Sequence, residues 1–314
     1  MPFFMIRDDI TNQEVDAIVC PSNRDPIIGG GAEADIHLKA GPSLLEARKA
    51  YGYLKDNDIV MTNGFDLKAK HVLHVISPVY DPNTNAQKRL TETYTHILSY
   101  AKAEDLDSIA FPLLSSGTYK YPKDIALKAA MSAIEPFLLA HDMTIYLVLY
   151  DEVSYRISKT LYQDIEDYLF GIIPIKQSVY RSERSWHVER HEALSLEDII
   201  HKSKETFMMK LFKWIDELQL TDVEVYKKAN IDRKLFSKMR SNLNYRPSKE
   251  TAIALAIALE LDLDDTRDLI RKAGYDLSDD LNFDLIIRYC IEHNIYNIYQ
   301  VNEILFDFDQ KLLG

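Results

Sequence analysis

The chain has 314 residues, 46% of them hydrophobic, which is enough for two domains with a core each. Its formal net charge of −12 excludes a protein whose whole surface coats nucleic acid or an anionic membrane. Two cysteines, Cys20 and Cys290, exclude a disulfide framework and a thiolate metal cluster. Arg7 interrupts the N-terminal apolar run too early for a secretory signal, and no run is long enough to span a membrane. We therefore expect a cytoplasmic protein without membrane contact, metal or cofactor.

The elements change character along the chain. Short β-branched runs at 15–20, 71–76, 108–114 and 144–150 alternate with helical patterns such as 123–140, which predicts an α/β domain over 1–170 with a mostly parallel sheet. Residues 171–202 are polar and poorly periodic, as in a linker. Only helical patterns follow, so we predict an all-α domain over 203–314.

Two loops of the first domain have the composition of phosphate-binding loops. In "PIIGGGAEADIHLKAG" (26–41), three glycines lead from a strand into a helix. In "PLLSSGTYKYP" (112–122), a Ser–Ser–Gly apex follows another strand and precedes a helix starting near Pro122. Such loops offer backbone N–H groups and the positive end of a helix to an anion. Either loop alone is more often a simple tight turn, but the pair predicts a grip on a diphosphate.

The ordered motifs "RDDIT", "VDAIVCPSN", "GGGAEADIHLKAG", "HVLHVISPVY" and "FPLLSSGTYKYP" resemble the macrodomain family of ADP-ribose-binding modules. The resemblance covers the first half of the chain and implies a three-layer α/β/α sandwich with a mixed, mostly parallel sheet. It places adenine at Asp9, beside Ile10, and near Tyr150, with Tyr155 as the reserve aromatic. It assigns the diphosphate and distal ribose to the two loops, at Gly29, Gly30, Gly31, Ser115, Ser116, Gly117, Thr118 and Tyr119.

The first loop departs from the family pattern at two positions. Macrodomains that remove ADP-ribose usually read N-A-A-N, with an Asp ten residues after the second Asn. Here the tetrad is "CPSN", so Cys20 replaces the first Asn, Asn23 keeps the second, and the acid is Glu33. The resemblance implies that Asn23 holds the distal ribose and Glu33 positions a water. The alternative is that Glu33 is an exposed acid favoured by the helix dipole.

Several of these residues also have purely structural interpretations. Asp9 is a common turn former, and Tyr119 a common packing aromatic. Cys20, at the end of a buried strand, is expected to fill space rather than act as a nucleophile. Histidines on periodic apolar segments are expected in the core and receive no function, and they are His37, His71 and His74.

The second half contains a basic island inside an acidic protein. Residues 227–249 carry eight Lys or Arg and one acid, Asp232. Five short helical segments with cap residues Thr221, Asp232, Ser248 and Asp262 or Asp264 resemble the repressor-like helix-turn-helix, whose third helix reads DNA. That helix would be "DRKLFSKMRS", with Leu235, Phe236 and Met239 toward the core. Its predicted DNA-binding residues are Arg233, Lys234, Ser237, Lys238 and Arg240.

Two functions remain open at this point. One is a macrodomain-type hydrolase that removes ADP-ribosyl groups, delivered to its target by the helical domain. The other is a non-catalytic sensor of ADP-ribose or a related nucleotide, coupled to DNA or protein binding. The five-helix unit could contact a protein instead of DNA, since such units do both. The purely structural interpretation of the basic residues is a solvated surface without a partner. We favour the hydrolase. The aromatic segment 282–314 is expected to pack on the helical unit or to form a homo-oligomer surface.

Overall fold

The computed structural model describes residues 2–150, 159–171 and 205–314. Almost all of the predicted linker, and the reserve adenine contact Tyr155, lie outside the described residues. Within the described part, no helix is both long enough and apolar enough to pass through a bilayer.

The first half is built on a six-stranded sheet with strand order β1-β6-β5-β2-β4-β3. Only the β3–β4 pair is antiparallel, which confirms the mixed, mostly parallel sheet. Four strands fall on the predicted apolar runs; β1 and β3 had no prediction. The strands are β1 (Phe3–Arg7), β2 (Ala17–Pro21), β3 (Ile59–Asn63), β4 (His71–Val75), β5 (Ser108–Pro112) and β6 (Thr144–Leu149).

Helices cover both faces of this sheet. The side chains of β2 alternate: Ala17 and Val19 join one buried cluster with α3 and α4, while Ile18 and Cys20 join another with α1 and α2. This gives the three layers that a parallel sheet requires. The elements are the short 3-10 helix η1 (Ile10–Asn12), α1 (Ala32–Ala40), α2 (Pro42–Lys49), α3 (Ala86–Ala103) and α4 (Lys123–Ala140).

The second half is helical as predicted. Thr221, Asp232, Ser248 and Asp262 each cap a helix by accepting a backbone N–H, so the predicted starts are confirmed. The helices are α7 (Phe207–Glu217), α8 (Asp222–Lys228), α9 (Arg233–Arg240), α10 (Lys249–Ala258), α11 (Leu263–Lys272), α12 (Asn282–Glu292) and α13 (Ile298–Asp307).

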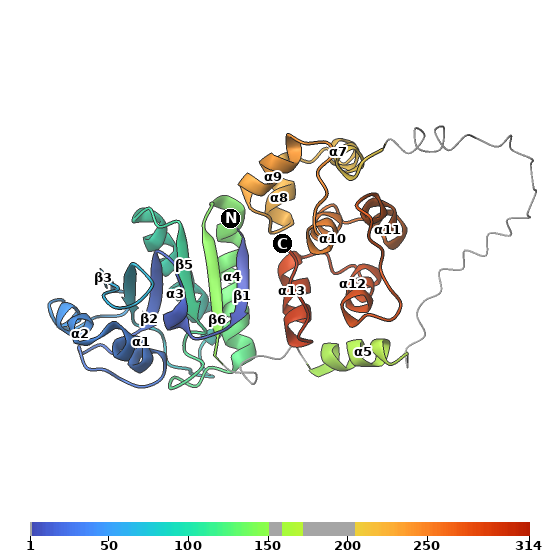
Figure 1. The fold of residues 1–314 in the computed structure, drawn as a ribbon. Helices are drawn as coiled ribbons and strands as arrows, with labels where there is room; N and C mark the ends of the chain where they lie inside the picture. The colour runs from blue at the N-terminus through green and yellow to red at the C-terminus, as the bar shows by residue number, and fades with distance from the viewer. Residues whose placement is uncertain (1, 151–158, 172–204) are drawn as a thin grey trace, which may run out of the picture.

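The two halves share a hydrophobic core, which differs from the expectation of one core each. One cluster of buried side chains runs from the sheet through α3 and α4 into α7 to α13. Figure 1 shows α13 beside β1, where Phe3 and Tyr299 pack edge to face with ring centroids 5.8 Å apart. The segment 282–314 therefore packs on the α/β half as well as on the helical unit.

Helix α5 (Lys159–Leu169) lies within the predicted α/β domain, just before its boundary at residue 170. It packs with the helical half: Tyr168 lies against Tyr289 of α12 and donates its hydroxyl proton to Glu292, 3.1 Å away. Tyr162 stacks on Phe308 just after α13. The amphipathic α5 therefore packs its apolar face against α12 and the segment just after α13.

Candidate functional site

A cavity of about 550 Å³ opens at the carboxyl ends of the parallel strands. Its lining includes Pro21, Pro112 and Leu149, the last residues of β2, β5 and β6. This is the edge at which open α/β sheets bind ligands, and the volume is ordinary for a small-molecule site.

Every macrodomain-type site residue predicted within the described part of the chain lines this one cavity. The two loops, separated by some eighty residues in sequence, face each other across it because β2 and β5 are neighbours in the sheet. The roles of the individual residues stay predictions. The lining includes Asp9, Ile10, Asn23, Gly29, Gly30, Gly31, Glu33, Ser115, Ser116, Gly117, Thr118, Tyr119 and Tyr150.

Glu33 is the best-defined polar group of the site. Its Oε1 accepts the backbone N–H of Asn23 at 3.0 Å, and its Oε2 accepts that of Gly29 at 2.9 Å. The residue is only 6% exposed, so the alternative interpretation, a solvent-exposed acid at the helix end, is wrong. Burial occurs because the loop from Asn23 to Gly29 folds back over the first turn of α1. The carboxylate therefore fixes the shape of the glycine loop.

The environment of Glu33 also changes its titration. Burial raises the pKa of this carboxyl, while the two backbone N–H groups and the Arg48 guanidinium oppose that rise. A carboxylate has four lone-pair positions, so two remain for a water or a ligand hydroxyl. A base with a raised pKa is a better proton acceptor near neutral pH.

Gly29 is required by the same arrangement. A Cβ at this position would lie 2.6 Å from Glu33 Oε2 and 2.8 Å from Asn23 Nδ2, well inside van der Waals contact. Asn23 in turn donates its side-chain N–H to the carbonyl of Ile27, 2.9 Å away. The loop, the amide and the carboxylate are thus packed against each other without spare room.

Arg48 of α2 also holds this loop in place through hydrogen bonds to its carbonyl groups. No role was predicted for this residue from the sequence. The guanidinium is 2% exposed and donates to the carbonyls of Asn23 (3.2 Å), Arg24 (3.1 Å) and Gly52 (2.6 Å). An arginine near the end of a short helix carries no sequence signal for burial, because only the fold of the loop brings the carbonyls to it.

At the other end of the cavity, Asp9 stabilises a turn, as its structural interpretation predicted. Its Oδ1 accepts the backbone N–H of Thr11 at 2.8 Å and the Thr11 hydroxyl at 2.7 Å, which caps η1. Ile10 is buried beside it. Asp8, which also lines the cavity, is held by Asn12 and Gln13, and these hydrogen bonds lower its pKa. A second acid beside Asp9 was visible in "RDD" but had no prediction.

The Ser–Gly loop uses its hydroxyls internally. Ser115 donates to the Pro78 carbonyl at 2.9 Å and Ser116 to the Leu113 carbonyl at 2.8 Å. Ser115 is left-handed, with φ of 62°, a strained conformation that is common at binding sites. Its backbone direction leaves the exposed N–H groups of Gly117 and Thr118 without a partner among the described residues. Backbone N–H groups rather than serine hydroxyls are therefore the donors this loop offers.

Other cavity residues had no prediction. Asp35 lies in the first turn of α1, two residues after Glu33, and Lys123 begins α4 directly after Pro122. Lys123 is the one cationic side chain in the cavity lining described here, against four acids. Its position directly after the Ser–Gly loop could have indicated a lysine at the cavity.

Helix α9, which was predicted to contact DNA, turns the predicted apolar side chains toward the core and the predicted polar and basic side chains outward. Phe236 and Met239 are buried, Leu235 is partly buried, and Arg233, Lys234, Ser237 and Lys238 are exposed. Arg240 is exposed as well, but it lies over the Phe212 ring, 4.0 Å from its centroid, and pairs with Asp222 at 3.4 Å. Lys238 makes a looser contact of the same kind, 5.7 Å from the centroid of the Tyr245 ring.

Half of the eight basic residues in this segment contact other residues of the protein, some of them at the surface. Lys227 donates to the Leu139 carbonyl at 2.9 Å at the end of α4, and Lys249 pairs at 2.7 Å with Asp284, whose side chain is fully buried. Lys228 pairs with Glu260 at 3.0 Å. The local charge of this segment therefore overstates the free positive charge on the surface, because its acidic partners come from distant parts of the chain.

The sequence of the α/β half matches known proteins. Residues 19–130 match the model of the macro domain family. The α/β half is 38% identical to a macro domain-containing protein of Xanthomonas axonopodis over 157 residues, 47% of this chain and 88% of the relative. It is 37% identical to an O-acetyl-ADP-ribose deacetylase of an Enterobacter species over 160 residues, 49% of this chain and 89% of the relative.

Solved structures of macrodomains also match. An Oceanobacillus iheyensis macrodomain with ADP aligns at 30% identity and a TM-score of 0.46, covering 55% of this chain and 93% of that one. A Trypanosoma brucei macrodomain in complex with ADP-ribose aligns at 32% identity and a TM-score of 0.45, covering 49% and 66%. From the sequence relatives, whose length this chain covers almost completely, the chain belongs to the macro domain family.

Proposed function

We propose that this protein binds ADP-ribose in the cavity at the sheet edge and hydrolyses bonds at the distal ribose of ADP-ribosyl compounds. The observation that carries the proposal is that both anion-binding loops and the Asn23–Glu33 pair line the same cavity. Relatives are named O-acetyl-ADP-ribose deacetylases, which makes O-acetyl-ADP-ribose the first substrate to test.

The proposed ligand position follows from the donors and acceptors of the lining. Exposed backbone N–H groups of Gly30, Gly31, Gly117 and Thr118 face a diphosphate from two sides, with the N-terminus of α1 behind it. Adenine lies toward Asp9 and Tyr150, and the distal ribose lies toward Asn23 and Glu33. Four acids in the lining repel the phosphates, so Lys123 and the helix end are needed to offset them.

The proposed chemistry uses Glu33 as the proton acceptor. A water held by the carboxylate attacks the electrophilic carbon at the distal ribose, either the anomeric carbon or the acyl carbon of an ester on that sugar. The water oxygen forms the new bond, its proton passes to Glu33, and the leaving oxygen takes the bonding electron pair and a proton. Asn23, fixed by Ile27, orients the sugar.

The experiment measures free ADP-ribose released from O-acetyl-ADP-ribose and from ester-linked ADP-ribosyl peptides. Glu33→Gln is expected to lower turnover by about 100-fold or more, because it removes the proton acceptor. It also weakens affinity, since a glutamine amide cannot accept both the Asn23 and the Gly29 N–H. The matched control is Glu46→Gln, an exposed carboxylate on α2. Equal turnover in the two variants would refute the proposal.

A second candidate function is a sensor that couples ADP-ribose occupancy to DNA binding through a helix-turn-helix. The observation that favours it is the exposed cationic face of α9, at Arg233, Lys234 and Lys238, for which no ion pair occurs among the described residues. A physical route for this coupling would run through Arg7 at the end of β1. Its guanidinium donates to the Phe306 carbonyl in the last turn of α13 and to Asp309 just after that helix, and Asp8 and Asp9 follow Arg7 directly.

A further inference from the structure

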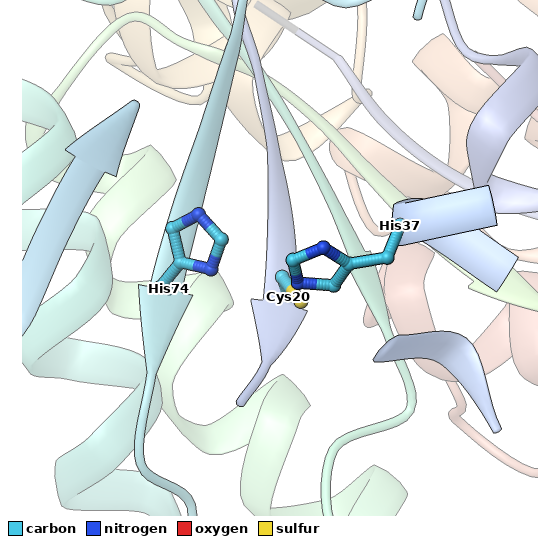
Figure 2. A group of neighbouring side chains, drawn as sticks. All are labelled: Cys20, His37 and His74. Atoms are coloured by element: carbon cyan, nitrogen blue, oxygen red, sulfur yellow. The ribbon is translucent and has the colours of Figure 1, made fainter. Parts of the chain in front are cut away.

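Three potential metal ligands meet beneath the glycine loop. Cys20 comes from β2, His74 from β4 and His37 from α1, and one ligand atom of each lies within 4.8 Å of the others. Figure 2 shows the two rings and the sulfur turned toward one another between the sheet and α1. All three are buried, with 0%, 0% and 5% exposure for Cys20, His74 and His37, and none lines the ligand cavity. They form a centre separate from the proposed active site.

His37 carries the signature of a missing partner. Its Nδ1 is buried and makes no hydrogen bond with the described residues. Buried polar atoms are almost always satisfied, so such an atom needs an explanation. Its ring lies 6.0 Å from that of His74, centroid to centroid, in a helix that otherwise packs apolar side chains on the sheet. A core histidine was expected here, but with a hydrogen-bonded ring.

Two hydroxyl groups fix the orientation of the His74 ring, and a cation at Nδ1 would take the place of one of them, the Ser22 hydroxyl. Its Nε2 lies 3.0 Å from the Thr62 hydroxyl of β3, and its Nδ1 lies 3.0 Å from the Ser22 hydroxyl. Ser22 also lies 3.3 Å from the Cys20 sulfur, so Nδ1 faces the cluster. A metal-binding imidazole keeps one nitrogen on the metal and donates the other N–H to a fixed acceptor, a role that Thr62 fits.

We propose that Cys20, His37 and His74 form a structural site for a borderline divalent cation of the zinc class. One thiolate and two imidazoles are the donors that such ions select, and Ser22 or a water completes four-coordination. With a Zn–S distance of about 2.3 Å and Zn–N of about 2.0–2.1 Å, tetrahedral ligand atoms lie about 3.5 Å apart. Separations of up to 4.8 Å therefore have to shorten by up to about 1.3 Å when a cation binds.

The position of the site gives it a consequence for the cavity. His37 follows Glu33 by one helical turn on the same face of α1, and Cys20 precedes Asn23 by three residues at the end of β2. A cation bound here ties α1 to β2 and β4. It thereby holds Glu33 and Asn23 at their relative positions without touching the ligand.

The test uses the full chain and needs neither ADP-ribose nor activity. Protein stripped with a chelator and kept reduced is titrated with Co²⁺, whose bond to a thiolate gives a charge-transfer absorption, and then with Zn²⁺ in competition. We expect one equivalent per chain, displacement of Co²⁺ by Zn²⁺, and a rise in the thermal midpoint on zinc addition.

Variants identify the ligands. Cys20→Ser is expected to abolish the charge-transfer band, and His37→Gln to weaken Co²⁺ affinity by at least about tenfold. Cys290→Ser is the matched control, because Cys290 is equally buried in α12 and far from the cluster in sequence and fold. Circular dichroism verifies folding of each variant. Absence of the band in the unchanged protein, its persistence in Cys20→Ser, or its loss in Cys290→Ser would overturn the proposal.

Discussion

The side-chain amide of Asn230 makes two hydrogen bonds with the backbone of Phe3, one to its N–H and one to its carbonyl group. Phe3 N–H donates to Asn230 Oδ1 at 2.7 Å, and Asn230 Nδ2 donates to the Phe3 carbonyl at 2.9 Å. Phe3 lies on β1, the edge strand of the sheet, so one asparagine of the helical half replaces a missing neighbouring strand. Asn230 can do this because it ends α8 in the left-handed conformation, with φ of 56°.

This pairing predicts the cost of losing Asn230. Asn230→Ala leaves two buried backbone groups of Phe3 without partners, so the free energy of unfolding should fall by about 2–4 kcal/mol. Asn294→Ala is the control: it has the same residue type and left-handed φ (57°) after α12, but it is exposed. Urea unfolding of both variants isolates the two hydrogen bonds. Equal losses would mean that the Phe3 contact contributes nothing.

Gly29 and Gly30 make a second matched pair. Gly29→Ala places a methyl group 2.6 Å from Glu33 Oε2, and the expected loss in unfolding free energy is about 1–3 kcal/mol. At Gly30 an added Cβ meets nothing within 4 Å, so Gly30→Ala should leave stability unchanged or raise it by up to about 1 kcal/mol. Denaturant titration without ligand measures both, and the opposite order of stabilities would refute the packing argument.

The pH dependence of turnover reports on Glu33. Burial raises the pKa of its carboxyl, and only the ionised form accepts a proton, so activity should fall as the pH drops through this raised value. The acid limb of kcat/KM is therefore expected above the ordinary glutamate range near 4.5. Profiles of kcat/KM for the unchanged protein and for Glu46→Gln should coincide. An acid limb at or below the ordinary value would argue against Glu33 as the base.

His74 predicts how stability depends on pH. Its pKa is 6.5 when unfolded and about 3 when folded, so its contribution is present above about pH 6.5 and is lost as the pH falls toward 3. His74→Gln removes this titration. With chelator present, the slope of unfolding free energy against pH between these limits should be smaller by up to about 1.4 kcal/mol per pH unit. His96→Gln, at an exposed position on α3, should leave the slope unchanged.

DNA binding by α9 is tested at Lys234 and Lys238, which are exposed. Arg240 is left in place because its contact with Phe212 makes it structural. If α9 enters a major groove, changing both lysines to Ala should weaken duplex binding and reduce the salt slope by about one unit per lost phosphate contact.

The charge-matched control for this experiment is the double change of Lys102 and Lys128 to Ala, both exposed on α3 and α4. Anisotropy titrations at low salt, with and without ADP-ribose, measure all three proteins. If the unchanged protein binds no duplex at low salt, the sensor alternative is dropped.

The sequence alone determined the features that depend on neighbouring residues. Apolar runs located β2, β4, β5 and β6, because buried strands need continuous hydrophobic residues. Cap residues located the helix starts, including Thr221 and Asp232, because capping is satisfied within one turn. The order of the motifs located both loops of the cavity, because chain order and sheet topology bring the carboxyl ends of β2 and β5 together.

Only the tertiary structure decided what depends on distant partners. Glu33 is buried because the Asn23–Gly29 loop folds over it, and nothing in α1 itself indicates that. Lys249 pairs with the buried Asp284, so its charge is neutralised within the helical half although part of the side chain is exposed. The edge strand β1 carried no prediction, because the strand it pairs with, β6, lies at the other end of the α/β half. Burial and charge pairing depend on which residues come into contact in the folded chain. A sequence pattern identifies the residues but not their partners.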